Sequence, residues 1–435
     1  MNYKGHIAVV GGGLAGTECA YFLSKSGILT DLYEMKPLRF SEAHRSEKLA
    51  ELVCSNSLKS KNPYNPQGLL KEEMKRFGSL IIEAAENTSV PAGDSLSVDR
   101  EMFSDYITGK ISSLGNINII RDEVLNPEAL LNKYDAVVIA TGPLTSQSLA
   151  ASFRKMIGGT DLLYFYDAVS PVVTSDSIDM EKAFLGSRYG KGGDDYINCP
   201  LSEDEYKKLY EAIIGAELVN SHIDENLRFF EGCLPVEEIA RRGFKSLSFG
   251  PFKPVGLGFE KINMPYAVVQ LRAENRKKTL YSVVAFQTRM KYSSQEHVLR
   301  LIPALRNCEI VRYGQMHRNV YINSPEVMNE NLSLKNNSKV FVSGTLLGVE
   351  GYTEAAQSGI IVAIAVISFL MGREFNPPPD MTAMGLLYRY IRGEISAGRE
   401  FVPTNINKGL FLHNGAKRYS EKMAEDAVRM IEEYV

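Results

Sequence analysis

Three features of the first 34 residues predict an α/β fold of the dinucleotide-binding Rossmann type. A continuous apolar strand, His6–Val10, leads into the glycine-rich turn Gly11–Gly16 (GGGLAG). A helix is expected over Thr17–Ser26, and a second strand over Ile28–Tyr33 ends at Glu34. A loop is expected to follow, from Met35 to about Ser60. Strand, glycine turn, helix, strand and acid follow one another in the order that a βαβ unit with a bound nucleotide requires.

Later segments extend this unit. Asp135–Ala140 and Lys339–Gly344 predict two more buried strands, and Tyr352–Leu370 predicts a long buried helix. The last twenty residues, which carry many charges, also show helical spacing. Between them lie glycine turns, a polar helix and a basic stretch punctuated by prolines, which are typical of an insertion. We therefore predict a discontinuous nucleotide-binding domain over residues 1–185 and 290–435, with a smaller α+β domain inserted at 186–289, to which residues 90–118 could be joined.

Composition excludes several classes of protein. The 435 residues include 44% hydrophobic side chains, enough for a large core, and no apolar run reaches the length of a membrane span. The short apolar start runs straight into the glycine turn, so it predicts a first strand rather than a signal peptide, and we expect a cytoplasmic protein. Five widely spaced cysteines without a CxxC pair predict no metal site. With a net charge of −3, RNA binding would require a local basic face.

The glycine turn has a specific chemistry. Gly11 allows the tight turn, Gly13 lets the backbone approach a diphosphate, and Gly16 lets the helix pack on the strand. The amides that open the helix, around Gly12, Leu14 and Ala15, would hold the diphosphate with the positive end of the helix dipole. Glu34 would accept hydrogen bonds from ribose hydroxyls, and its charge disfavours the 2′-phosphate of NADP at this site.

Two later segments favour FAD over NAD as the bound nucleotide. Val137–Pro143, which contains Thr141 and Gly142, resembles the ATG element of flavoproteins with two dinucleotide folds. Val340–Gly359 resembles the element that closes on the flavin ring, and it supplies Gly344, Gly348, Glu350 and Gly351. No second GxGxxG is present, so NAD(P)H would bind transiently against the flavin. The predicted fold is therefore the FAD-binding Rossmann type with an inserted domain.

Two cysteines stand in polar surroundings. Cys54 lies in AELVCSNSLKS and Cys233 in FFEGCLPVEEIARRG. A thiol near arginines at the start of a helix can be reactive, although either cysteine could also belong to a core. Basic residues gather in several groups, two of which contain Arg272 and Arg312; such groups are usually solvated faces, and phosphate binding is the alternative.

The motifs together resemble the folate- and FAD-dependent tRNA (uracil-5-)-methyltransferases over nearly the whole chain. The matching runs include GGGLAGTECAYFLSKSGILTDLYEMKP, SLSVDREMFS, GDDYINCPL, FEGCLPVEEIARRG, AFQTRMKY, VRYGQMHRNVYINSP and PTNINKGL. One departure is Thr345, which stands where the family has a glutamine near the flavin edge.

The resemblance implies a reaction. Methylenetetrahydrofolate would donate the carbon, reduced FAD would carry and reduce it, and NAD(P)H would reduce the flavin again. The family's two functional cysteines fall on Cys233, taken as the nucleophile at uracil C6, and Cys54, taken as the base for the C5 proton; the two roles could be exchanged. The expected substrate is the T-loop uridine of tRNA, and a uridine of 23S rRNA is the alternative. Two further alternatives are a relative of the flavoprotein that modifies the tRNA wobble uridine, and a binding module without catalysis.

Overall fold

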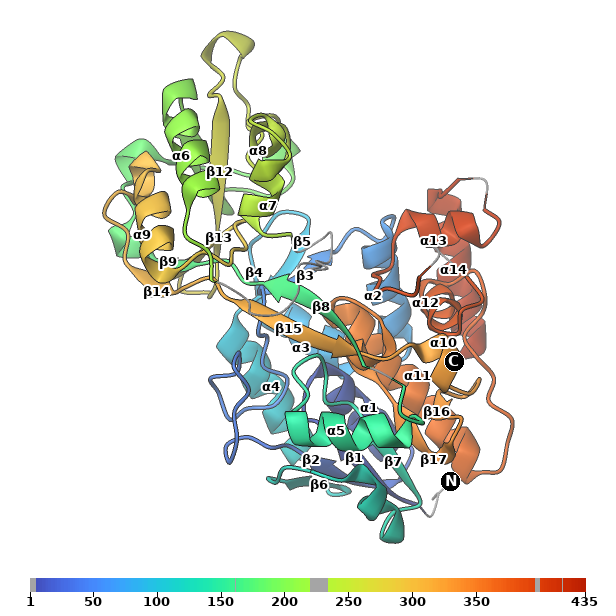
Figure 1. Cartoon of the computed structure of the whole chain (residues 1–435). Helices are drawn as coiled ribbons and strands as arrows, with labels where there is room; N and C mark the ends of the chain where they lie inside the picture. Colours follow the sequence, from blue (N-terminus) through green and yellow to red (C-terminus); the bar gives the residue numbers. More distant parts are fainter. Residues whose placement is uncertain (1–4, 161, 220–233, 396–399, 417) are drawn as a thin grey trace.

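A six-stranded sheet forms the base of the molecule (Figure 1). The computed structural model describes residues 5–435 apart from 161, 220–233, 396–399 and 417. The strand order is β16 (Ser333–Leu334), β17 (Asn337–Val342), β7 (Ala136–Ile139), β1 (His6–Val10), β2 (Leu29–Tyr33) and β6 (Ile117–Ile120). All pairs are parallel except β16 with β17. The predicted strands are confirmed, and their continuous apolar runs reflect a sheet covered on both faces.

Two helices pack closely beneath the glycine turn. α1 (Leu14–Lys25) follows β1, and α11 (Tyr352–Leu370) is the long buried helix that the sequence predicts. A Cβ atom on Gly359 of α11 would lie 2.4 Å from the carbonyl oxygen of Ala15, so only glycine permits this approach. α11 is long and apolar enough to cross a membrane, but 72% of its apolar window is buried inside the protein. It is therefore a core helix.

A second unit has its own core and an antiparallel sheet. The strand order is β10 (Phe184–Leu185), β11 (Tyr196–Leu201), β12 (Ala267–Ala273), β13 (Leu280–Val283), β9 (Val172–Thr174) and β14 (Ile310–Arg312). Helices α6 (Glu203–Gly215), α7 (Val236–Arg241), α8 (Ser246–Phe249) and α9 (Tyr292–Arg300) belong to the same unit. The predicted limits at 186 and 289, and the joining of residues 90–118, stay a prediction; we propose to draw this unit with its sheet, from Val172 to Arg312.

Two smaller sheets join the units. β8 (Leu163–Ala168) and β15 (Met316–Tyr321) pair antiparallel and run side by side between them (Figure 1). β3 (Ser57–Ser60), β5 (Ser95–Val98) and β4 (Ser89–Val90) form the other sheet. The expected loop from Met35 to about Ser60 is therefore wrong at its end, where the last four residues form β3. β3 has a polar sequence, and its partner strand β5 comes 35 residues later in the chain, so the sequence did not predict it.

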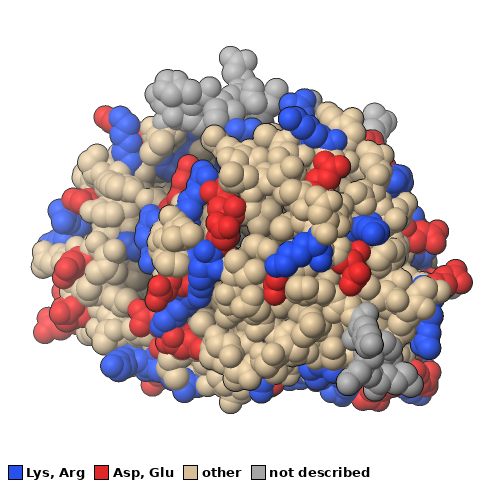
Figure 2. Space-filling model, turned by 90° about the horizontal axis from the view of Figure 1, so that it is seen from below, with Lys and Arg blue, Asp and Glu red and all other residues tan. Residues whose placement is uncertain are grey.

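The remaining helices complete the first unit. They are α2 (Pro66–Arg76), α3 (Leu80–Asn87), α4 (Arg100–Ser112), α5 (Gln147–Met156), α10 (Ser324–Val327), α12 (Ala383–Ile391), α13 (Lys408–His413) and α14 (Glu421–Tyr434). α14 confirms the helical spacing that the sequence shows near its end. The face of the molecule seen in Figure 2 carries acidic and basic side chains intermixed, so this face does not present charge of one sign.

Candidate active site

A cavity of about 470 Å³ lies where the parallel strands end and the two units meet. Its wall includes Val10, Tyr33 and Ala140, which stand at the carboxyl ends of β1, β2 and β7. The second unit contributes Arg272 of β12 and Ser282 of β13 to the opposite wall. The carboxyl edge of a parallel sheet is where ligands bind in open α/β folds, so this cavity is the candidate site.

The glycine turn forms one end of the cavity. Gly11 has a φ of +108°, and a Cβ atom there would lie 2.5 Å from the carbonyl oxygen of Ala140. Gly13 has open space where a Cβ atom would stand, so a ligand can reach its backbone. α1 begins there without a side-chain cap in the described chain, which leaves its first amide N–H groups for a ligand. The turn therefore fits a diphosphate on the helix N-terminus.

Glu34 is held beside this turn. Its carboxylate accepts hydrogen bonds from the amides of Gly12, at 3.2 Å, and Lys36, at 2.9 Å. The side chain is 6% exposed and lines the cavity. A Cβ atom on Gly12 would lie 2.7 Å from a carboxylate oxygen of Glu34. The acid is thus fixed next to the turn, where a ribose attached to the diphosphate would lie.

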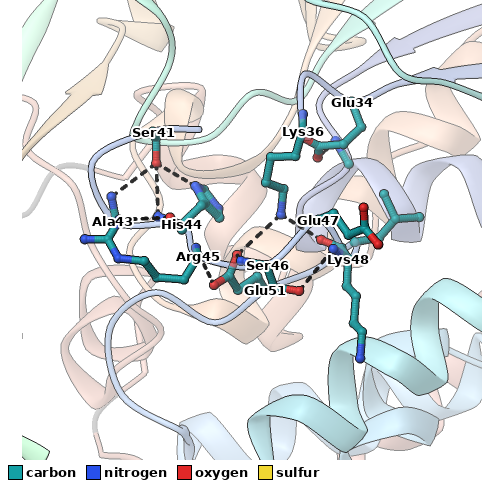
Figure 3. A network of polar contacts seen from close by, with 12 residues as sticks. Glu34, Lys36, Ser41, Ala43, His44, Arg45, Ser46, Glu47, Lys48 and Glu51 are labelled. Atoms are coloured by element: carbon teal, nitrogen blue, oxygen red, sulfur yellow. Dashed lines mark hydrogen bonds and ion pairs between the residues drawn. The ribbon is translucent and has the colours of Figure 1, made fainter. Parts of the chain in front are cut away.

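The loop after β2 is folded by its own polar contacts (Figure 3). The ammonium group of Lys36 donates to the carbonyl oxygen of Lys48 at 2.6 Å. Glu51 accepts the backbone amides of Arg45, at 2.9 Å, and Ser46, at 3.1 Å. These contacts fix the loop between the end of β2 and Glu51 against the cavity wall. Cys54, three residues after Glu51, therefore also lies at the cavity.

Cys54 lies on the cavity wall and is half-buried. Its amide donates a hydrogen bond of 2.8 Å to the hydroxyl of Tyr352, at the start of α11. From the other side, the guanidinium of Arg100 donates to the carbonyl oxygens of Leu52, at 2.5 Å, and Cys54, at 2.6 Å. The backbone at Cys54 is therefore fixed by two chain-distant side chains, and its thiol donates a weak hydrogen bond of 3.9 Å to the carbonyl oxygen of Ala168.

Behind Cys54, three arginines surround one acid. Arg100 and Arg312 donate to Glu274 at 2.5 Å and 3.2 Å, and Arg272 also lines this part of the cavity. Burial opposes ionisation of Glu274, but Arg100 and Arg312 outweigh it and lower its pKa to about 2. Three guanidinium groups against one carboxylate leave an excess of positive charge, which would stabilise an anion at this end of the cavity.

The closing segment forms the remaining wall. Gly344 has a φ of +83° and packs against Ala15, while Gly351, at +118°, precedes α11. The hydroxyl oxygen of Thr345 is buried and has no hydrogen-bond partner among the described residues. Because Thr345 lines the cavity, this hydroxyl can bond a ligand even though the family's glutamine is replaced.

Glu350 is half-buried in this wall. Desolvation by burial, followed by the nearby Asp167, raises the pKa of Glu350 to about 8. Its carboxyl is therefore mostly protonated at neutral pH and can donate a hydrogen bond into the cavity.

The raised pKa of Glu350 predicts that the stability of the fold depends on pH. Folding raises the pKa of Glu350 above its ordinary 4.5, so the folded chain holds this proton more tightly than the unfolded chain does. The free energy of unfolding should fall as pH rises from 4.5 through 8. Because the group is partly open to the cavity, we expect a loss of about 1–3 kcal/mol. Glu350→Gln should remove this part of the slope in denaturant titrations at several pH values. Identical slopes would show that the carboxyl is ionised in the folded protein.

Most of the predicted site residues meet in this cavity. Its lining includes Gly11, Gly12, Gly13, Leu14, Ala15, Glu34, Cys54, Thr141, Gly142, Gly344, Glu350 and Gly351. Gly16 and Gly348 stand behind the lining. A Cβ atom on Gly16 would lie 1.9 Å from the carbonyl oxygen of Gly11, and one on Gly348 would lie 2.5 Å from the ring of Phe401. Cys233 lies outside the described residues. The binding roles of all these residues stay predictions.

The sequence alone does not predict the polar wall around Cys54. Arg272 and Arg312 belong to basic groups whose sequence pattern favours solvated faces or phosphate binding, yet both line the cavity near Glu274. Arg100 and Tyr352 carried no local signal. His44 also lines the cavity; burial and the charge of Lys36 lower its pKa to about 4, so its imidazole is neutral at pH 7.

Fold and cavity together define an FAD-binding flavoprotein of the Rossmann type. The glycine turn, the acid beside it and the second helix N-terminus at Gly351 fit a long dinucleotide whose ring end lies toward Cys54. A solved structure of GidA from Aquifex aeolicus has the same fold, with a TM-score of 0.71 over 99% of this chain and 73% of that one, at 15% identity.

Sequence comparison narrows the class. The profile of the family described as glucose inhibited division protein A matches residues 6–374. A methylenetetrahydrofolate–tRNA-(uracil-5-)-methyltransferase TrmFO from Caldicellulosiruptor bescii is 49% identical over 93% of this chain and 91% of its own length. The protein of the same name from Natranaerobius thermophilus is 47% identical over 99% of both chains. This chain belongs to the family of the methylenetetrahydrofolate–tRNA-(uracil-5-)-methyltransferases, which confirms the resemblance of its motifs.

Proposed function

We propose that this chain methylates C5 of a uridine in tRNA, the T-loop uridine, with methylenetetrahydrofolate as the carbon donor and reduced FAD as carrier and reductant. The observation that carries the proposal is a single cavity that runs from the glycine turn at Gly11–Gly13 to the thiol of Cys54. The relatives' names, at 45–49% identity, favour tRNA over the rRNA alternative.

The protein's own groups would perform the acid–base and covalent steps. Uracil C5 is a poor nucleophile, and addition of a cysteine thiolate to C6 makes it reactive. We assign this addition to Cys233 and removal of the C5 proton to Cys54. Positive charge from Arg100, Arg272 and Arg312 would stabilise the anionic uracil that addition creates. Bound FAD would supply the one-carbon unit and the hydride.

Several features of the polar wall support the role of Cys54. Hydrogen bonds from Arg100 and to Tyr352 fix its backbone, so the sulfur can be held within reach of one atom of the substrate. Cys54 is half-buried and lines the cavity, so a substrate bound there can approach this residue. NAD(P)H would bind transiently to reduce the flavin, and the protein would work in the cytoplasm, where its folate and tRNA substrates are found.

The proposal is tested by purifying the protein and following a labelled carbon. The protein should be yellow, release FAD on denaturation, and transfer label from methylenetetrahydrofolate to unmodified tRNA. Parallel reactions contain 23S rRNA instead, and others omit NAD(P)H. Label in rRNA alone would overturn the proposed substrate. A colourless protein that does not take up FAD would overturn the proposed class of enzyme.

A further inference from the structure

A second cavity, of about 330 Å³, adjoins the first at its Cys54 end. Lys59 of β3 lines both cavities, and the next residue, Ser60, lines only the second. On β12, Arg272 lines the first cavity and Gln270, two residues away on the same face of the strand, lines the second. The second cavity therefore continues the first beyond Cys54, away from the glycine turn.

Two loops build its walls in a fixed arrangement. The amide of Gly93, before β5, donates to the carboxylate of Asp195 at 2.7 Å, and the hydroxyl of Tyr196 donates to the carbonyl oxygen of Ala92 at 3.0 Å. A Cβ atom on Gly192 would lie 2.9 Å from the Cα atom of Gly93, so the loops touch through their backbones. The cavity is therefore formed by tightly packed backbone.

The lining is cationic and aromatic. Arg188 donates from Nε to Gln270 at 2.7 Å and from Nη1 to the carbonyl oxygen of Val255 at 2.9 Å. Its buried Nη2 has no hydrogen-bond partner within the described part of the chain. Lys191 pairs with Asp94 at 2.6 Å. Lys59, the other cation in the lining, pairs with Glu354 at 3.3 Å. An anion in the cavity would therefore satisfy the remaining donor, Nη2 of Arg188.

Two tyrosines stand beside these cations. Tyr189 follows Arg188 with a φ of +59°, a conformation that costs energy for a residue with a side chain. Its amide donates to the carbonyl oxygen of Gly256 at 2.6 Å, which holds the residue there, and the side chain is 57% exposed. Tyr196 lines the same cavity from β11. Cations with aromatic rings suit a ligand that joins a flat ring to a carboxylate.

We propose that the second cavity binds the p-aminobenzoyl-glutamate tail of the folate, with a tail carboxylate on Arg188. This inference rests on the proposed function, since the reactive end of methylenetetrahydrofolate must lie in the first cavity with the flavin. The rest of the folate carries a benzene ring and then carboxylates, and it has to leave by the Cys54 end. The second cavity has Tyr189 and Tyr196 in its lining for the benzene ring and Arg188 for a carboxylate.

The test compares folates with and without the glutamate on the FAD-loaded protein. Binding of tetrahydrofolate and of tetrahydropteroate, which lacks glutamate, is followed through the flavin absorbance. We expect tetrahydropteroate to bind about 10-fold more weakly to the unaltered protein. In Arg188→Gln the two ligands should bind equally weakly, with FAD content and tRNA affinity unchanged. Lys61→Gln, an exposed cation one residue beyond Ser60, is the matched control and should keep the 10-fold difference.

The possible results distinguish failure of the tail site from failure of the proposed function. If the unaltered protein binds tetrahydrofolate and tetrahydropteroate equally well, the tail site is overturned, whatever the variants show. Weaker tRNA binding by Arg188→Gln, with folate binding unchanged, would assign the cavity to an RNA phosphate and overturn it as well. Lys191→Gln removes a more exposed cation and should reduce the difference in the same direction if Arg188→Gln fails to fold. Loss of transfer with every folate would count against the proposed function instead.

Discussion

Replacing Cys54 with alanine should remove methyl transfer to tRNA and leave FAD bound. Cys54 lines the cavity but does not belong to the glycine turn, so its loss leaves the nucleotide contacts intact. A base positioned on the reacting atom contributes a factor of about 100–10,000, and we expect transfer to fall about 1,000-fold or more. The measurement is the single-turnover rate with labelled methylenetetrahydrofolate, alongside the FAD released per chain. Cys233→Ala should have the same two effects.

A control variant and a substrate analogue that accumulates the covalent adduct complete this test of the two thiols. Cys308→Ala removes a cysteine that is buried in the second unit and should leave the rate within about twofold, since it touches no reacting group. In tRNA with 5-fluorouridine at the target, the C5 substituent is not lost as a proton, so a covalent adduct accumulates. If Cys233 is the nucleophile, Cys54→Ala still forms this adduct and Cys233→Ala does not. Full activity of Cys54→Ala would end its assignment.

The guanidinium fork of Arg100 should prove nearly as important as the thiol that it positions. Arg100→Met leaves the buried Glu274 with fewer partners and the carbonyl oxygens of Leu52 and Cys54 without donors. Removing one member of a buried ion pair is strongly destabilising, and we expect a loss of about 3 kcal/mol. Arg100→Lys keeps the charge but cannot reach both carbonyls. We expect it to stay folded and to lose about 100-fold in single-turnover rate, because the Cys54 backbone then keeps only its hydrogen bond to Tyr352.

Arg276 provides the matched comparison. Its guanidinium also donates to two backbone carbonyl oxygens, those of Ser89 and Asn87, but it is exposed and lies outside both cavities. Arg276→Lys should therefore leave the transfer rate and the FAD content unchanged. If Arg100→Lys transfers as fast as the unaltered protein, the arginine serves stability alone. A loss of FAD equal to the loss of rate would also contradict a positioning role at Cys54.

The nucleotide end of the site could be predicted from sequence because its parts are local. Gly11, Gly13 and Glu34 lie within 24 residues, and the conformations that they need are encoded in residue type. The long helix at Tyr352–Leu370 was predictable for the same reason, since its apolar run is continuous.

The environment of Cys54 could not be predicted in this way. Its partners Arg100 and Tyr352 lie 46 and 298 residues away, and only the folded chain brings them together. The pattern of charges did not place Arg272 and Arg312 in the cavity. In a sequence, arginines that line a cavity next to an acid cannot be distinguished from arginines on a solvated surface. The short strand β3 was missed because its serines favour loops and its partner strand is distant.

A crystal structure of the yellow protein with its FAD is the most direct test of the proposed binding mode. Diphosphate oxygens should lie within about 3 Å of the amide nitrogens at Gly13–Ala15. A ribose should lie on the carboxylate of Glu34, and the flavin ring should lie in the part of the cavity that Cys54 lines. A diphosphate bound elsewhere, or a flavin ring separated from the sulfur of Cys54 by protein, would contradict this binding mode.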